Sequence, residues 1–271
     1  MALRPKIALG YLESLLIALA QISHLARESF ASLTKRILPL RTYVSLTFEQ
    51  IVLLGQRSLP VVMLGGIAIG SIMALQLGYG LKRFGGNLYV PAIVGIAVLR
   101  ELGPILICLL LAGRVGSGIT AEIAAMTVTE QVEAIIALGS NPIAELVVPR
   151  VVACMIVFPI LALVGDYLGI LSAMWIGRME FGIPFGFFLS KTLESIQLTD
   201  VFGGLVKSFV FGLMISVVAC WKGLSPQGGT RGVGLSTTEV VVISSILVLI
   251  GDVFLTKLLI EVGWFGAIEA A

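Results

Sequence analysis

The chain has 271 residues, of which 58% are apolar and 13% are charged, and its mean hydropathy is +1.05. A soluble domain carries about 25% charged residues, so this composition argues against a soluble protein and predicts an integral membrane protein. The net charge of +2 is too small to indicate a nucleic-acid partner.

Residues 9–33 place leucines and isoleucines at helical spacing, but polar residues such as Glu13, Arg27 and Glu28 interrupt the run. This pattern predicts an amphipathic helix lying in the membrane interface, with a short additional span as the alternative. We therefore divide the chain into an N-terminal interfacial region, residues 1–45, and a transmembrane domain, residues 46–271.

Five stretches are apolar and long enough to cross a membrane, which takes about 20 residues. They cover residues 59–81, about 88–113, about 151–176, about 201–221 and about 240–260. The expected fold is all-α, a bundle of five transmembrane helices plus the interfacial helix. The spans contain two small-xxx-small patterns, "GIAIG" and "GDYLG", which let helices approach closely. The charged residues inside the spans are Arg100, Glu101, Asp166, Lys207, Asp252 and Lys257.

The distribution of lysine and arginine predicts the orientation, because cytoplasmic segments of membrane proteins are enriched in both. With the N-terminus in the cytoplasm, the segment 114–150 is cytoplasmic and the loop 177–200 is external, where its "FGIPFGFF" phenylalanines should touch the interface. The outer segments then hold only Lys82, Arg83, Arg178 and Lys191. The inner segments hold Arg4, Lys6, Arg27, Lys35, Arg36, Arg41, Arg57, Arg114, Arg150, Lys222 and Arg231.

The residue patterns of common catalytic and metal sites are missing from the sequence. The glycine-rich "AGRVGSG" at 112–118 lacks the Lys-Ser/Thr ending of a nucleotide-binding phosphate loop. His24 is the only histidine, and Cys108, Cys154 and Cys220 lie in apolar runs without zinc-ligand spacing. We therefore expect no enzyme, no metal and no cofactor in this chain.

The stretch "TAEIAAMTVTEQVEAIIAL", residues 120–138, carries three glutamates and no basic residue between two apolar runs. On one helical wheel Glu122 and Glu133 fall on the same face, Glu130 lies about 60° away, and the valines occupy another face. The pattern fits a solvated connector, or a docking helix that shows its carboxylates to basic groups of a soluble partner. The following "EAIIALGSNPIAELVVPR" partly resembles the loop by which importer permeases seat an ATPase.

Four motifs carry a more specific resemblance. "LRELGPIL" (99–106), "AGRVGSGITAEIAAMTVTEQVEAI" (112–135), "NPIAELVVPR" (141–150) and "GVGLSTTEVVV" (232–242) together resemble the MlaE (YrbE-type) family of ABC transporter permeases. The resemblance extends over roughly residues 40–262, and it identifies 232–238 with the family's second cytoplasmic loop.

The resemblance implies a homodimeric permease of the inner membrane that binds two ATPase subunits and an external oligomer of an MCE-domain protein. Such a complex moves phospholipid or a related lipid between the inner membrane and an outer acceptor. It also implies that 120–138 is the coupling helix, so we expect contacts to the ATPase from Glu122, Glu130, Gln131, Glu133 and Arg114. The end of the first span and the "LREL" motif are expected to line a lipid cavity, through Met73, Gln76, Leu77, Leu81, Phe84, Arg100, Glu101 and Lys207.

Two other functions are compatible with parts of the sequence. The chain could be a small-solute ABC importer permease, or a proton-coupled secondary transporter that uses Glu101, Asp166 and Asp252 as a relay. Glu101 itself has two interpretations: it lines the lipid cavity, with Lys207 binding the lipid phosphate, or it forms a structural ion pair with Lys207 or Lys257. Arg100 should point about 100° away from Glu101, so these two neighbours are not expected to neutralise each other.

Overall fold

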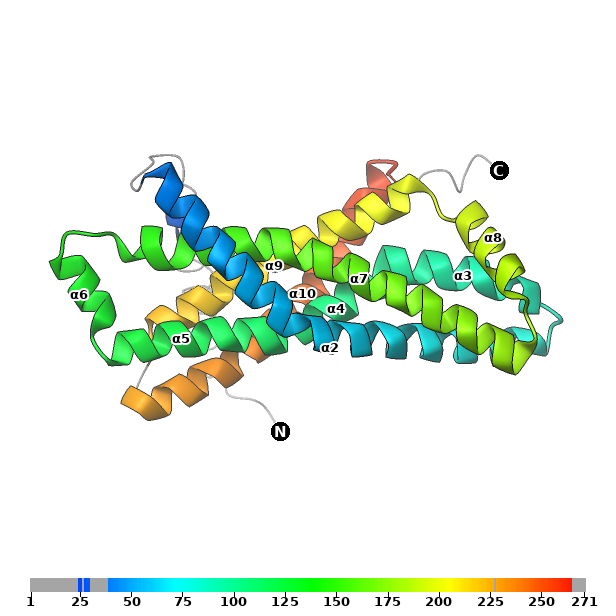
Figure 1. The fold of residues 1–271 in the computed structure, drawn as a ribbon, viewed down its shortest axis with the longest axis horizontal. Helices are drawn as coiled ribbons and strands as arrows, with labels where there is room; N and C mark the ends of the chain where they lie inside the picture. The colour runs from blue at the N-terminus through cyan, green and yellow to red at the C-terminus, as the bar shows by residue number, and fades with distance from the viewer. Residues whose placement is uncertain (1–23, 26, 30–38, 227, 265–271) are drawn as a thin grey trace, which may run out of the picture.

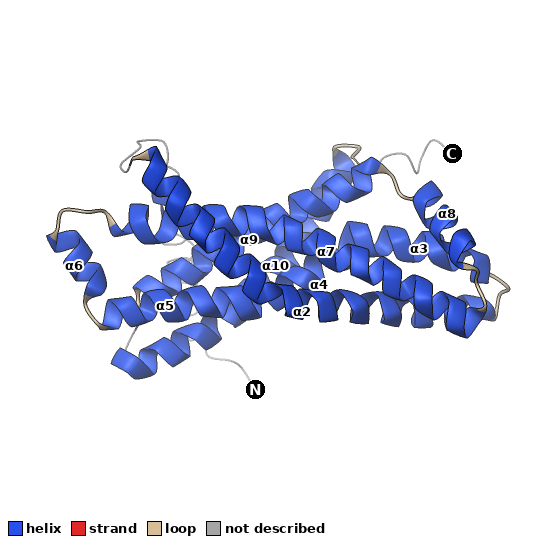
Figure 2. Ribbon diagram, viewed as in Figure 1, coloured by secondary structure: helices blue, strands red, loops and turns tan. Residues whose placement is uncertain are grey.

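The computed structural model describes residues 24–25, 27–29, 39–226 and 228–264, and within these ranges the protein is almost entirely helical and has no β-strand (Figure 2). Most of the expected interfacial helix at 9–33 lies outside the described residues. The helices are α2 (Leu40–Lys82), α3 (Val90–Ala97), α4 (Gly103–Leu111), α5 (Ser117–Val128), α6 (Gln131–Ala137), α7 (Val148–Phe181), α8 (Phe185–Ser195), α9 (Leu198–Leu224) and α10 (Gly229–Glu261).

Within the residues that the structure describes, five helical stretches are long and apolar enough to span a membrane, in agreement with the five spans of the expected fold. They are Arg41–Lys82, Asn87–Val128, Ile143–Phe181, Leu198–Leu224 and Gly229–Glu261. All five extend beyond the apolar runs, because a helix continues into water wherever the backbone allows it. The bundle is elongated, with α6 at one end and α3 and α8 at the other (Figure 1).

The second membrane-crossing helix is built from several segments that follow one another without a break, from the short 3₁₀ turn Asn87–Tyr89 through α3, α4 and α5. Two π-helical turns interrupt its α-helical geometry, at Val98–Leu102 and at Ala112–Gly116. A third π turn, Ile143–Val147, precedes α7. In two of the three, a proline follows two residues after the turn, at Pro104 and Pro149.

The prolines account for the two wide turns that precede them. A proline has no N–H to donate to the carbonyl four residues back, so the helix before it is free to open. In the first turn the Gly103 N–H donates to Val98, and in the third the Val148 N–H donates to Ile143, five residues back in each case. The wide turn therefore keeps the backbone hydrogen-bonded inside the membrane, where unpaired amides are costly.

Helices α2 and α7 cross along four glycines, Gly66 and Gly70 on α2 and Gly165 and Gly169 on α7, which we name the glycine seam. A Cβ atom built on Gly70 would lie 1.8 Å from the Gly169 carbonyl oxygen, and one built on Gly66 would lie 2.3 Å from the Gly165 oxygen. Beside the seam, the Ser172 hydroxyl donates to the Ile67 carbonyl at 2.9 Å. The two small-xxx-small patterns therefore pack directly against each other.

The expected external loop contains a helix, α8, that packs on α3 (Figure 1). Phe188 is fully buried in a core cluster with Val90 and Val94, and the Thr192 hydroxyl donates to the Pro91 carbonyl at 3.1 Å. The expectation that all the loop's phenylalanines touch the interface is therefore wrong for Phe188, because α3 offers it a protein surface. Phe185 is exposed and stacks near Trp175.

The segment 232–238 is also not a loop. Helix α10 begins at Gly229 and includes it, and at this end Lys222 of α9 forms an ion pair with Glu239 of α10 at 2.6 Å. This pair ties the last two membrane-crossing helices together on the side of the bundle that carries α6 (Figure 1).

Candidate functional site

Three of the charged residues of the spans meet with one threonine in a group that we name the charge cluster: Glu101, Lys207, Asp252 and Thr256. The side chain of Lys207 is completely buried, and its ammonium donates to the Glu101 carboxylate and to the Thr256 hydroxyl, the latter at 2.7 Å. Asp252 Oδ1 lies 3.2 Å from the same ammonium, in ion-pair contact without hydrogen-bond geometry. Residues from α9, α10 and the π turn Val98–Leu102 thus share one buried cation.

Thr256 links Lys207 and Glu101 through its hydroxyl. Its hydroxyl donates to the Glu101 carboxylate at 3.2 Å while it accepts from Lys207. Glu101 keeps about a third of its side chain exposed, whereas Asp252 keeps 13%. The cluster is therefore closed around the lysine and open on the side of Glu101.

Arg100 pairs elsewhere, as expected from its direction on the helix. Its guanidinium donates to Asp200 of α9 through Nη2 at 2.5 Å and Nε at 3.0 Å. Asp200 also accepts the backbone N–H of Gln197 at 3.0 Å, in a capping box that starts α9. This forked contact fixes α9 to the same π turn that carries Glu101.

Sequence reasoning missed Asp200 and Thr256. Asp200 stands three residues after Gln197, at the spacing of a capping box, and that pattern could have drawn attention to it. The three carboxylates of the hypothetical relay are not joined: Glu101 and Asp252 share Lys207, but Asp166 is not part of the charge cluster. Instead Asp166 packs against Gly103, where an added Cβ atom would lie 1.5 Å from its Oδ1.

Lys207 does not present its ammonium to an outside ligand in this structure, because it is buried and held by Glu101, Asp252 and Thr256. Of the two interpretations of Glu101, the structure contains the contact that the second one requires, the ion pair with Lys207. The exposure of Glu101 is compatible with a cavity wall as well.

The remaining residues expected to line the lipid cavity lie along the C-terminal half of α2 and, for Phe84, in the turn that follows it. Met73, Leu77 and Leu81 are half-buried against the core cluster that contains Phe188. Gln76 and Phe84 are exposed, Phe84 by 86%. This half of α2 thus presents a mixed apolar surface near the α3 and α8 end of the bundle.

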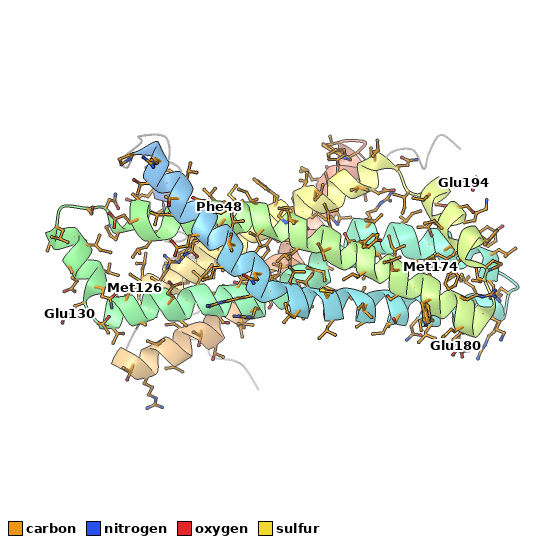
Figure 3. The ribbon with its side chains drawn as sticks, viewed as in Figure 1. Phe48, Met126, Glu130, Met174, Glu180 and Glu194 are labelled. Carbon is orange, nitrogen blue, oxygen red and sulfur yellow. The ribbon has the colours of Figure 1, made fainter. Side chains whose placement is uncertain are left out.

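The acidic segment is not one helix. Helix α5 ends at Val128, Glu130 adopts a left-handed conformation with φ 60°, and α6 spans only Gln131–Ala137. The single helical wheel over 120–138 is therefore wrong, because the chain turns at Thr129–Glu130. Figure 3 places Glu130 at the end of the bundle, opposite Glu180 and Glu194.

Helix α6 still has the two faces that the pattern indicated. Val132 is buried, whereas Glu130, Gln131 and Glu133 are exposed, and in the part of the chain that the structure describes neither glutamate forms an ion pair. Beside these polar groups, Ile136 is 56% exposed and Leu138 is 85% exposed. A polar and apolar surface of this kind is suited to contact with another protein.

Glu122 and Arg114 lie on the other side of the turn, on the second membrane-crossing helix. Glu122 pairs with Arg150, the buried arginine at the start of α7, at 2.9 Å, and half of its side chain remains exposed. Arg114 lies in the π turn Ala112–Gly116, about two turns before Glu122 along the same helix, and is exposed.

Comparison with known proteins agrees with this architecture. The Permease MlaE family model matches residues 47–258. The chain is 42% identical over 234 residues to a probable ABC transporter permease protein of Rickettsia typhi, covering 86% of this chain and 90% of that protein. It is 36% identical to a probable ABC transporter permease protein of Synechocystis, with 79% and 82% covered, and 37% identical to one of Porphyra purpurea, with 79% and 81% covered.

Proposed function

The chain belongs to the MlaE permease family, and we propose that it moves phospholipid or a related lipid between the inner membrane and an outer acceptor. As an ABC transporter permease it is a multi-pass membrane subunit that works with a separate ATPase. Two copies of the chain would form the permease, with two ATPase subunits in the cytoplasm and an MCE-domain oligomer outside. The N-terminus is on the cytoplasmic side.

The position and surface of helix α6 support the proposed coupling between the permease and the ATPase. It closes one end of the bundle, joins two membrane-crossing helices, and presents unpaired carboxylates next to the exposed Ile136 and Leu138. Basic side chains on the ATPase would bind Glu130 and Glu133, and Gln131 would add a hydrogen bond. Glu122 would support this contact from α5, since half of its side chain stays exposed beside its ion pair with Arg150.

The lipid would enter beside the outer half of α2 and the open side of the charge cluster. Met73, Leu77 and Leu81 offer apolar surface for acyl chains, Gln76 and Phe84 lie at its exposed edge, and Glu101 supplies the polar spot. Arg100 and Lys207 act in this scheme by holding Glu101 and α9 in place through their ion pairs.

Lipid co-purification tests the proposal. We expect the complex purified from its native membrane to carry a lipid whose headgroup, identified by mass spectrometry, is enriched over the bulk membrane. Leu81→Trp should lower the bound lipid several-fold while the ATPase stays attached. Ile160→Trp, at an exposed apolar position on α7, is the matched control.

Glu101→Gln adds a second measurement, because it keeps the size of the side chain and removes its charge. We expect it to slow ATP-driven lipid transfer in vesicles more than it weakens assembly. The lipid assignment would be wrong if the wild-type complex carried no enriched lipid and if Leu81→Trp left both bound lipid and transfer unchanged.

A further inference from the structure

A cavity of about 410 Å³ lies between α2 and the second membrane-crossing helix, towards the α6 end. Arg57 of α2 and Arg114 of the π turn Ala112–Gly116 both line it, together with Leu53, Leu54, Ile119 and Glu122. Its volume falls within the roughly 300–1,000 Å³ of small-molecule sites. A glycerophosphate headgroup therefore fits.

The cavity carries a net positive charge. Arg57 and Arg114 are both exposed, and neither forms an ion pair with any residue that the structure describes. Glu122 is the acidic residue in the wall, and its carboxylate is engaged by Arg150 at 2.9 Å. Two guanidiniums facing one space are suited to a phosphate, which accepts forked hydrogen bonds from arginine.

The two arginines lie at the level of lipid headgroups. Arg57 precedes Lys82 by 25 residues of one helix, which is roughly 37 Å at 1.5 Å per residue, and the apolar core of a bilayer is about 30 Å thick. Arg114 follows Asn87 by 27 residues, or roughly 40 Å, along the second membrane-crossing helix. Both side chains therefore reach the same membrane surface.

An apolar path leads from the cavity towards the membrane centre. Val61 and Leu64 follow Arg57 at helical spacing on α2 and are 36% and 70% exposed. Leu110, which is 38% exposed, lies one turn before Arg114 and packs beside Gly65 of α2, where an added Cβ atom would meet it at 2.4 Å. The acyl chains of a lipid could lie along these three side chains. A free phosphate has no acyl chains and would make no use of this apolar surface.

We propose that the Arg57–Arg114 cavity binds the headgroup phosphate of an anionic phospholipid of the cytoplasmic leaflet, as a resident lipid separate from the transported one. Basic pockets between membrane helices on the cytoplasmic side bind anionic headgroups in this way. The inference rests on the proposed function only for the assignment of this end of the bundle to the cytoplasmic side.

The test is retention of phosphatidylglycerol by the complex of permease and ATPase in phosphatidylcholine nanodiscs, measured by native mass spectrometry without ATP. The double variant Arg57→Gln, Arg114→Gln should bind phosphatidylglycerol roughly 10- to 30-fold more weakly, since each cation near the surface contributes about 1 kcal/mol. Arg57→Lys, Arg114→Lys keeps both charges but loses the forked hydrogen bonds, so it should bind more tightly than the glutamine variant and more weakly than the wild type.

Lys82→Gln, Arg83→Gln is the matched control, because it removes two exposed charges from the other end of α2. The proposal is overturned if this control loses as much phosphatidylglycerol as the Arg57 and Arg114 variant, or if that variant binds like the wild type. Excess inorganic phosphate should displace none of the lipid; displacement would mean that the cavity takes free phosphate. Because no transport is measured, a negative result here leaves the proposed lipid transport standing. A negative result in the transport assays likewise leaves the measured binding of phosphatidylglycerol unchanged.

Discussion

The glycine seam and the charge cluster both join helices inside the membrane domain, but they do so by opposite means. In the seam, Gly66 and Gly70 bring the backbones of α2 and α7 into contact, so that no room is left for one more carbon atom. In the cluster, Lys207 holds two carboxylates that would be costly to bury alone. The seam is therefore sensitive to atoms that are added, and the cluster is sensitive to atoms that are removed.

The largest effect is expected from removing the shared cation. Lys207→Met would leave Glu101 and Asp252 side by side without a counter-charge, and breaking a buried ion pair costs about 3–5 kcal/mol. We expect a correspondingly lower stability of the purified permease, measured by thermal or denaturant unfolding in lipid nanodiscs.

A triple variant of the charge cluster is the control for Lys207→Met. Lys207→Met combined with Glu101→Gln and Asp252→Asn removes the stranded charges and should recover at least half of the lost stability. A Lys207→Met protein as stable as the wild type would show that the cluster does not hold the helices together.

The next largest effect is expected from adding one carbon atom to the seam. In Gly70→Ala the new Cβ atom would meet the Gly169 backbone, which cannot rotate away as a side chain can, so α2 and α7 must separate. Overpacking of this kind costs about 1–3 kcal/mol. Gly80→Ala, on the same helix with no atom within 4 Å of its Cβ, should keep wild-type stability in the same unfolding measurement.

Charges outside both regions should act on assembly and leave the bundle intact. Reversing Glu130 and Glu133 to lysine should weaken ATPase binding by roughly 1.5–3 kcal/mol if the contacts are partly buried, and by less than 1 kcal/mol if they stay exposed. Pull-down of the ATPase and the coupling of ATP hydrolysis to lipid transfer measure this, with Glu194→Lys on α8 as control. Retention of the ATPase at wild-type strength, with normal transfer, would reduce α6 to a connector.

The smallest effect is expected where the C-terminal ends of α2 and α7 meet through exposed groups. The Tyr79 hydroxyl donates to Glu180 at 3.0 Å, and the Tyr79 ring packs edge-on against Phe181. Tyr79→Phe removes only the hydrogen bond, which is exposed to solvent, and should leave the stability close to that of the wild type in the same unfolding measurement. A larger loss would mean that the contact between these helices depends on this polar link as well as on the seam.

The hydropathy of the sequence predicted the spans because length and apolar composition nearly suffice for a membrane helix. The glycine pairs were visible as patterns, and both proved to be contacts. The separate directions of Arg100 and Glu101 were also predictable, since neighbouring helical side chains diverge by about 100°.

The features that the sequence did not predict depend on contacts between distant residues or on single backbone angles. The turn at Glu130 has no glycine or proline to announce it, so a single helix through 120–138 was the natural expectation. Asp200 lies at a span boundary, where a carboxylate is unremarkable until α9 packs beside the π turn with Arg100. The burial of Phe188 required α3 to be in place, and no local pattern carries that information.

The unbroken course of the second membrane-crossing helix has a mechanical consequence. From Glu101 to Val128 it runs 27 residues, which makes a lever of roughly 40 Å. A tilt of about 5° around the charge cluster would displace the far end by about 3.5 Å, which is more than the length of a hydrogen bond. The left-handed Glu130 ends this lever directly before α6, so a displacement of the lever would move the start of α6 with it.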